Sequence, residues 1–146
     1  MLHTAPITDL CHVALCGTTG AGKSNLHRLL LAQILARGAR VWLADPHYTP
    51  LDVETGEDWR PIVQRLDRAP ARKPAEIRHM LETLTHELGV RLERRSRSEY
   101  VGPLLFFAFD ELPVILDSVT GAEKMVRDIL RQGRKVKLLT IGASQD

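Results

Sequence analysis

One run of eight residues near the start of the chain constrains its fold more than any other segment. Gly17–Ser24 reads GTTGAGKS and fits the pattern GxxxxGK[ST], in which glycines let the backbone bend and aim its amide groups at phosphate oxygens. The apolar run Val13–Cys16 precedes it, and a stretch with helical spacing of apolar residues follows. This order of strand, turn and helix predicts a phosphate-binding loop in an α/β domain, because the positive end of the helix dipole would then lie at the turn.

The segment after the loop predicts a helix and a second buried strand. Apolar residues recur at three-and-four spacing and form one face of a helix that is expected to end at Arg37 and Gly38. They are Leu26, Leu29, Leu30, Ile34 and Leu35. The strand Val41–Ala44 stops at Asp45-Pro46, because proline cannot donate to a sheet ladder. A loop and a weak helix near Trp59–Leu66 are expected next. The order of these elements indicates that a parallel sheet has begun.

A longer helix is expected over about Ala75–Arg95. Its apolar residues keep the spacing of one buried face, with Ile77, Met80, Leu81, Leu84, Leu88 and Leu92 on it. Its C-terminal end gathers Arg91, Arg94, Arg95 and Arg97, and cations there complement the helix dipole.

A third strand ends in two acidic residues. The run Leu104–Phe109 is apolar at every position, as in a central strand covered on both faces, and Asp110 and Glu111 follow it. Thr120 and Glu123 have the spacing of a capping box for a helix that ends near Gly133.

A last strand, Val136–Ala143, leads to Gln145 at the end of the chain. Together these elements predict a three-layer α/β domain whose mainly parallel sheet is flanked by helices.

Composition bounds the class of protein. A chain of 146 residues that is 44% hydrophobic can bury one core, and a formal charge of +2 gives no argument for nucleic acid on net charge alone. Cys11 and Cys16 are expected to be reduced core residues on opposite faces of one strand. Neither a secretory signal nor an apolar run of membrane-spanning length is present, so a cytoplasmic domain without membrane contact is expected.

The motifs predict a chemistry of phosphoryl transfer. In such a loop Lys23 bridges the β- and γ-phosphates of a nucleoside triphosphate and Ser24 ligates Mg²⁺. Asp110 is the expected second magnesium ligand, and Glu111 the general base that activates a water. Gln145 at a strand end is a candidate sensor of the γ-phosphate. The alternative interpretation is that Asp110 and Glu111 are simply two exposed acidic residues at the end of a strand. The presence of a phosphate loop in the same chain makes this alternative less favoured.

The chain resembles the FtsK/SpoIIIE and HerA group of hexameric DNA-pumping ATPases. The resemblance rests on short sequence motifs that occur in the same order as in the family: GTTGAGKSN at Gly17–Asn25, LADP at Leu43–Pro46, ERR at Glu93–Arg95, FDEL at Phe109–Leu112, and GRK followed by ASQ within Gly133–Gln145. It implies a RecA-like fold in which the last strand lies between the phosphate-loop strand and the Asp-Glu strand. It also implies that ATP contacts Gly17, Thr18, Thr19, Gly20, Ala21, Gly22, Lys23, Ser24 and Asn25.

Further implications of the resemblance concern partners. They are double-stranded DNA, a homo-hexamer, and a role for Arg134 in completing a neighbour's ATP site, where its charge would stabilise the transferring phosphoryl group. A solvated basic loop formed by Arg131, Arg134, Lys135 and Lys137 is the alternative for that residue.

The sequence also departs from the family. His47 stands where the family often has Lys, and Asp146 stands where it often has Arg-Pro. The family's core continues with at least one further strand. Residues 1–146 are therefore expected to be the N-terminal part of a larger motor domain, incomplete at the C-terminus.

Two further expectations concern side chains outside these motifs. No zinc site is expected, because His79 and His86 lack partners at ligand spacing. Trp42 and Trp59 are expected to pack in the core and loop rather than to stack on bases.

The sequence thus predicts ATP hydrolysis coupled to movement along double-stranded DNA. An ATP-dependent switch or assembly module that moves no DNA is the alternative, although Glu111 favours hydrolysis because a binding module has little need of a base. A small-molecule kinase would need an acceptor pocket and lid arginines, which the sequence does not show.

Overall fold

The computed structural model describes residues 12–17 and 22–145 and contains one four-stranded sheet. All strand pairs are parallel, and the order across the sheet is β1-β4-β3-β2. The strands are β1 (Val13–Gly17), β2 (Arg40–Ala44), β3 (Leu105–Asp110) and β4 (Leu138–Gln145). The predicted parallel sheet is confirmed, and so is the insertion of the last strand between the phosphate-loop strand and the Asp-Glu strand.

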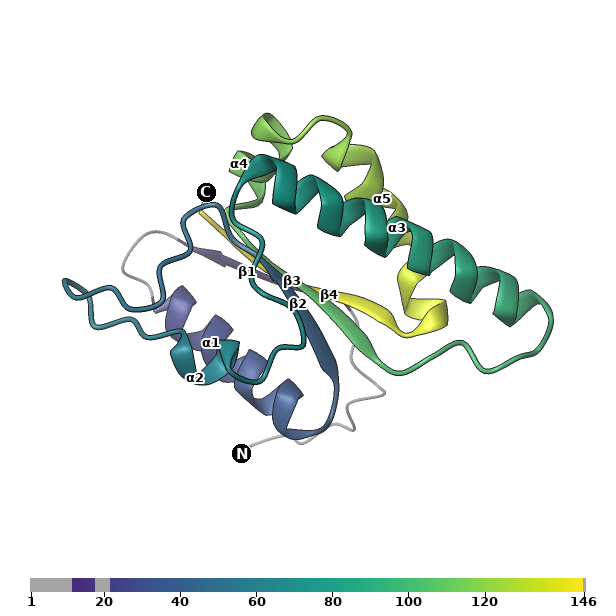
Figure 1. The fold of residues 1–146 in the computed structure, drawn as a ribbon, viewed down its shortest axis with the longest axis horizontal. Helices are drawn as coiled ribbons and strands as arrows, with labels where there is room; N and C mark the ends of the chain where they lie inside the picture. Colours follow the sequence, from purple (N-terminus) through teal and green to yellow (C-terminus); the bar gives the residue numbers. More distant parts are fainter. Residues whose placement is uncertain (1–11, 18–21, 146) are drawn as a thin grey trace.

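Helices cover both faces of the sheet (Figure 1). One face carries α1 (Lys23–Ala36) and the short α2 (Arg60–Val63), and the other carries α3 (Pro74–Ser96), α4 (Leu112–Ser118) and α5 (Ala122–Gln132). A 3₁₀ turn, η2 (Gly133–Val136), leads from α5 into β4. The three layers expected from the sequence are therefore present, with β3 and β4 in the middle of the sheet.

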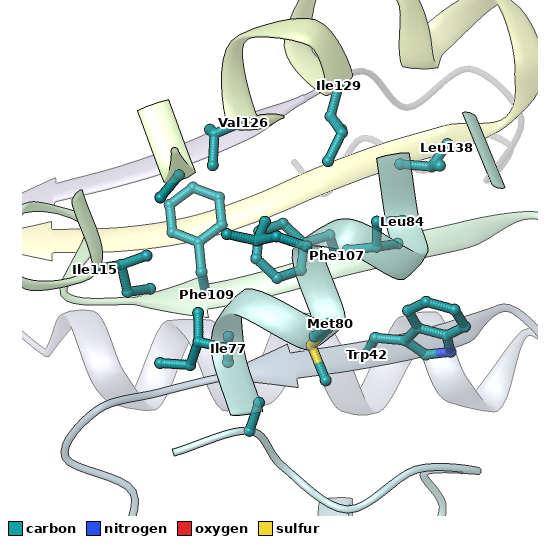
Figure 2. Packing of buried hydrophobic residues seen from close by; sticks show 14 of the residues in the cluster. Trp42, Ile77, Met80, Leu84, Phe107, Phe109, Ile115, Val126, Ile129 and Leu138 are labelled. Atoms are coloured by element: carbon teal, nitrogen blue, oxygen red, sulfur yellow. The ribbon is translucent and has the colours of Figure 1, made fainter. Parts of the chain in front are cut away.

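The central strand β3 is apolar at every position because it contributes to a core on each side. Phe106 and Ala108 face α1 and α2, whereas Phe107 and Phe109 face the helices of the opposite layer. Figure 2 shows the second of these cores, where the rings of Phe107 and Phe109 lie with their centroids 5.4 Å apart. Side chains of α3, α4 and α5 surround them, among them Ile77, Leu84, Ile115, Val126 and Ile129.

The buried face of α1 is only partly the expected one: Ile34 and Leu35 are buried and Leu30 packs against the core, as expected, but the first turns differ. Leu26 and Leu29 are 45% and 56% exposed, and the side chains that face the sheet include His27 and Leu31. The reason lies at the start of the helix, where Lys23 turns towards β4. Residues four and eight positions further on share its face of the helix, so His27 and Leu31 are carried inwards with it.

The start of α5 also corrects a prediction. The expected capping box at Thr120 and Glu123 is not formed: the N-cap is Gly121, with φ 82°, and no side chain caps the helix. The additional helix α4 occupies the segment just before it and ends at Ser118. Gly121 makes the sharp turn between the two helices, because glycine adopts positive φ at little cost.

Two expectations about the strands were wrong. The last strand begins at Leu138 rather than Val136, because residues up to Val136 form the 3₁₀ turn and Lys137 then adopts a left-handed conformation, φ 60°. Cys16 is exposed rather than buried, because β1 pairs only with β4 and lies at the edge of the described sheet. Cys11 lies outside the described residues.

No helix within residues 12–17 and 22–145 is long and apolar enough to cross a membrane. Trp42 and Trp59 are both buried, in agreement with the packing role expected for them.

Candidate nucleotide site

The phosphate loop ends where α1 begins. Gly22 is the N-cap and has φ 80° and ψ 12°, a left-handed conformation that glycine adopts without steric cost. Lys23, Ser24 and Asn25 form the first turn, which contains no acidic residue to offset the positive end of the helix dipole. Gly17 ends β1, and the predicted contacts of Thr18, Thr19, Gly20 and Ala21 lie outside the described residues. This turn is suited to an anion.

The Lys23 ammonium lies on the carboxyl end of β4. Its Nζ donates to the backbone carbonyl of Ser144 over 2.6 Å. The side chain therefore points across the edge of the sheet towards β3, where the Asp-Glu pair lies.

The turn after β3 presents that pair. Asp110 is the last residue of β3, and its Oδ1 accepts a hydrogen bond from the Glu111 amide at 2.9 Å. The same amide donates to the Ala143 carbonyl at 3.0 Å. Glu111 has φ 56° and ψ 53°, a left-handed conformation that is uncommon for a residue with a side chain. Backbone strain of this kind persists where the surroundings fix it, here through β4.

A third carboxylate lies beside Asp110. Burial and, to a smaller extent, the neighbouring charge of Asp45 raise the pKa of Asp110 to about 6, although Lys23 acts in the opposite direction. Asp45 follows β2, is 5% exposed, and accepts the amide of His47 on Oδ1 at 2.8 Å. Burial also raises the pKa of Asp45. The carboxylates thus stand in a setting that would favour a cation between or beside them.

Sequence reasoning used Asp45 only to mark the end of a strand. The signal that identified Asp110, an acidic residue directly after an apolar strand, is present at Asp45 as well. In a parallel sheet the carboxyl ends of neighbouring strands meet at one edge, and β2 pairs with β3 so that Ala44 lies opposite Phe109. The residues that follow these two are therefore neighbours.

These groups fit magnesium with a nucleotide. Among the described residues no cluster of three or more His, Cys, Asp or Glu side chains could hold a metal ion by itself. Mg²⁺ needs no such cluster, because it binds one or two protein oxygens together with phosphate oxygens and water. The Ser24 hydroxyl and the Asp110 carboxylate would supply those two oxygens.

The backbone also places Gln145 at this edge. In the register of β1 with β4, Gly17 lies opposite Gln145, and in the register of β3 with β4, Asp110 lies opposite Ala143. Its role as a γ-phosphate sensor stays a prediction.

Arg134 lies at the opposite end of the sheet. It is exposed in η2, before β4 begins, and its charge acts on His12 at the start of β1. The six residue steps from Leu138 to Ser144, at roughly 3.3 Å each, separate the two ends of β4 by about 20 Å. Arg134 therefore cannot reach the Lys23–Asp110 edge of its own chain.

The loop before α2 is fastened to the helix that follows the phosphate loop. His27 packs edge-on against Trp59, with 5.9 Å between the ring centroids, and Arg28 Nη1 donates to the Asp58 carbonyl at 3.1 Å. Trp59 Nε1 donates to Glu57 at 2.6 Å. This side of α1 is covered, which leaves its N-terminal end for the phosphate loop.

One protein-family model matches part of the chain. The family model described as "Helicase HerA, central domain" matches residues 10–58, which include the phosphate loop and β2. No curated protein matches the sequence as a relative.

Solved structures share the fold over nearly the whole chain. A structure of Thermomonospora curvata EccC (ATPases 2 and 3) with a signal sequence peptide has a TM-score of 0.72 and 23% identity, over 94% of this chain and 25% of that one. The cytoplasmic domain of the type VII secretion ATPase EccC from the same organism has a TM-score of 0.73 and 27% identity, over 94% and 16%.

A third similar structure is the pCW3 conjugation coupling protein TcpA, in its monomer form with ATPγS. Its TM-score is 0.70 and its identity 21%, over 93% of this chain and 43% of that one. The present chain thus spans less than half the length of each of these three. The phosphate loop, the parallel strand order, the partial match to the HerA family model and these shared folds show that the chain has a P-loop ATPase fold similar to that of the FtsK/HerA type.

Proposed function

We propose that this chain binds ATP with Mg²⁺ at the carboxyl edge of its sheet and hydrolyses it. One observation carries the proposal: Lys23 and Glu111, 88 positions apart in sequence, are held by consecutive carbonyls of one strand. Lys23 Nζ donates to Ser144, and the Glu111 amide donates to Ala143. This edge therefore brings together the ammonium group of Lys23 and the Asp110–Glu111 pair.

Each residue has a distinct part in the reaction. Lys23 would neutralise charge on the β- and γ-phosphates, and Ser24 and Asp110 would hold a magnesium ion that offsets the remaining phosphate charge. Glu111 would accept a proton from the attacking water. Gln145 contacts the γ-phosphate and reports whether it is still attached.

Two substitutions separate binding from hydrolysis. Lys23→Ala removes the cation on the phosphates and is expected to abolish tight ATP binding. Glu111→Gln keeps the shape of the side chain but removes the base, so binding should persist while turnover falls. Isothermal titration with ATP and phosphate release measure the two, and Glu123→Gln on the exposed side of α5 is the control. Unchanged phosphate release by Glu111→Gln would refute its assignment as the base.

We propose further that Arg134 acts on the ATP of a neighbouring subunit in a ring, by resemblance a homo-hexamer. Its position beyond the other end of β4, a strand about 20 Å long, supports this, since Arg134 cannot reach a phosphate bound in its own chain. Arginine supplied in trans is worth about 10³ to 10⁵ in rate in related systems. Excess Lys23→Ala subunits, which keep Arg134, should restore turnover to Arg134→Ala subunits. Equal turnover of Arg134→Ala and unmodified protein in the assembled ring would leave Arg134 as one cation of a solvated loop.

The work driven by hydrolysis is proposed to be movement along double-stranded DNA in the cytoplasm. The resemblance to DNA-pumping ATPases supports this, as does a group of exposed cations at the end of the sheet away from the nucleotide, namely Arg94, Arg95, Arg97, Arg131, Lys135 and Lys137. Such a group can contact phosphates.

Two alternatives remain for that work. One is a nucleotide-dependent switch that moves no DNA. The other is the handling of a polypeptide, because one similar structure is a secretion ATPase with a signal sequence peptide. The rate of ATP hydrolysis with and without double-stranded DNA distinguishes them: DNA should accelerate a translocase, and at rising salt the acceleration should fade. A rate insensitive to DNA would favour an alternative.

A further inference from the structure

A fully buried arginine connects α3 with the turn that carries Arg134. Arg91 is 1% exposed and is among the largest buried side chains of the described residues. It lies on the inner face of α3, three residues after Leu88 and seven after Leu84, where the pattern of the helix calls for an apolar side chain. A charge in such a place is stable only when its donors are paired.

The guanidinium of Arg91 is paired on two sides. Its Nε donates to Glu87 at 2.8 Å, within α3. Its Nη1 donates to the carbonyls of Val136 and Lys137, at 3.0 and 3.2 Å. These two carbonyls belong to the last residue of the 3₁₀ turn and to the residue between that turn and β4, so the guanidinium of one side chain joins a helix to the turn 45 positions later in sequence.

Two other segments of the chain pack closely against the Arg91 guanidinium or its acceptors. A Cβ on Gly102 would lie 3.0 Å from Arg91 Cζ and Nη2, so the loop before β3 passes this side chain at a distance that glycine allows. The Lys137 carbonyl also accepts the amide of Leu105 at 3.0 Å. Arg91 thus lies where α3, the loop before β3 and the start of β4 meet.

The turn itself has little freedom to take another shape. A Cβ on Gly133 would lie 2.1 Å from the Leu138 carbonyl oxygen, so the turn closes tightly on the first residue of β4. Lys137 has φ 60°, and its ammonium lies 5.2 Å from the centre of the Tyr100 ring. Between these fixed ends, Arg134 projects into solvent.

We propose that Arg91 is a positioning residue for Arg134: its buried guanidinium fixes the Gly133–Lys137 turn and so sets the place from which Arg134 reaches the nucleotide of a neighbouring subunit. The inference rests on the trans role proposed above for Arg134. An arginine that must meet a phosphate across a subunit boundary needs a rigid base, because an error of about 1 Å in position can cost roughly 100-fold in rate.

The test uses Arg91→Lys in the full-length, assembled protein. Lysine keeps the charge, but its compact ammonium cannot hold Glu87 and both carbonyls at once. We expect turnover to fall roughly 10- to 100-fold, with the affinity for ATP changed less than about twofold, because the chain's own phosphate site lies at the other end of the sheet. Arg78→Lys is the matched control, since Arg78 also pairs with a glutamate one turn away on α3, Glu82, but in solvent. It should leave turnover unchanged.

Mixed assemblies separate positioning from a general loss of structure. Arg91→Lys subunits should regain turnover with excess Lys23→Ala subunits, which supply a correctly held Arg134. They should not regain it with Arg134→Ala subunits, because neither partner then supplies a working arginine. A subunit that was simply damaged would fail in both mixtures.

Three outcomes would overturn the proposal, and they differ from one another. If Arg91→Lys hydrolysed ATP at the normal rate while Arg134→Ala was slow, the positioning role of Arg91 would be wrong, but the trans role of Arg134 would stand. A second outcome is that Lys23→Ala subunits restore the turnover of Arg134→Ala subunits but not that of Arg91→Lys subunits. This would place the defect of Arg91→Lys in the chain's own fold or site. Normal turnover of Arg134→Ala would remove the trans role itself, and this inference with it.

Discussion

Removing the imidazole of His27 is expected to change how the stability of the fold depends on pH. The side chain is completely buried on α1, and neither ring nitrogen has a hydrogen-bond partner in good geometry among the described residues, the Ile141 backbone making only a weak contact with the ring. Burial lowers the pKa of His27 from 6.5 to about 4, and the Ile141 backbone opposes this only in part. An imidazolium in this place would lose its hydration, and the Ile141 backbone would replace only part of it.

The sign and size of the effect follow from the two pKa values. The unfolded chain binds a proton at His27 near pH 6.5, whereas the folded chain does so only near pH 4. The free energy of unfolding therefore has its full value above about pH 6.5 and decreases as the pH falls towards 4. A separation of roughly 2.5 between the pKa values corresponds to a loss of about 3 kcal/mol.

Urea unfolding of the unmodified protein and of His27→Leu measures this loss. Leucine fills a similar volume without a titrating group, so the unmodified protein should lose about 3 kcal/mol more than the variant between about pH 8 and pH 4. The comparison is needed because the raised pKa of Asp110 gives a contribution of opposite sign, present at low pH and lost as the pH rises through about 6. Both proteins contain Asp110, so its contribution cancels in the difference.

The control is His79→Gln, which removes an exposed histidine from α3. It should leave the pH dependence of stability as in the unmodified protein. If His27→Leu and the unmodified protein lost the same stability on acidification, the buried, neutral state assigned to His27 would be wrong.

Two further predictions concern packing and charge. Gly142→Ala would place a Cβ 2.1 Å from Cε2 of Phe109, so we expect a loss of about 1–3 kcal/mol in urea unfolding, and an equal stability would contradict this contact. Arg91→Ala leaves two backbone carbonyls without their charged donor and should cost about 3–5 kcal/mol. Arg78→Ala breaks an exposed ion pair and should cost less than about 1 kcal/mol, so similar losses for the two arginines would refute the argument from burial.

The elements that carry the candidate phosphate site could be predicted from sequence because their signals are local. The pattern of Gly17–Ser24 specifies a turn, a cation and a hydroxyl within eight residues, and an acidic pair after a wholly apolar strand specifies the place of Asp110. Once the strands are parallel, their carboxyl ends must meet at one edge. The same reasoning could have found Asp45, which follows a shorter apolar strand.

The sequence by itself determined the strands, most of the helices and the parallel arrangement of the sheet, because each follows from a short-range pattern or from the geometry of parallel strands. Only the tertiary structure decided which face of α1 is buried, since Lys23 must reach β4 and carries His27 inwards with it. It also decided that Arg91 is a buried connection rather than a cation at a helix end. The burial of a polar side chain depends on partners far away in sequence, here the carbonyls of Val136 and Lys137, and no local pattern records them.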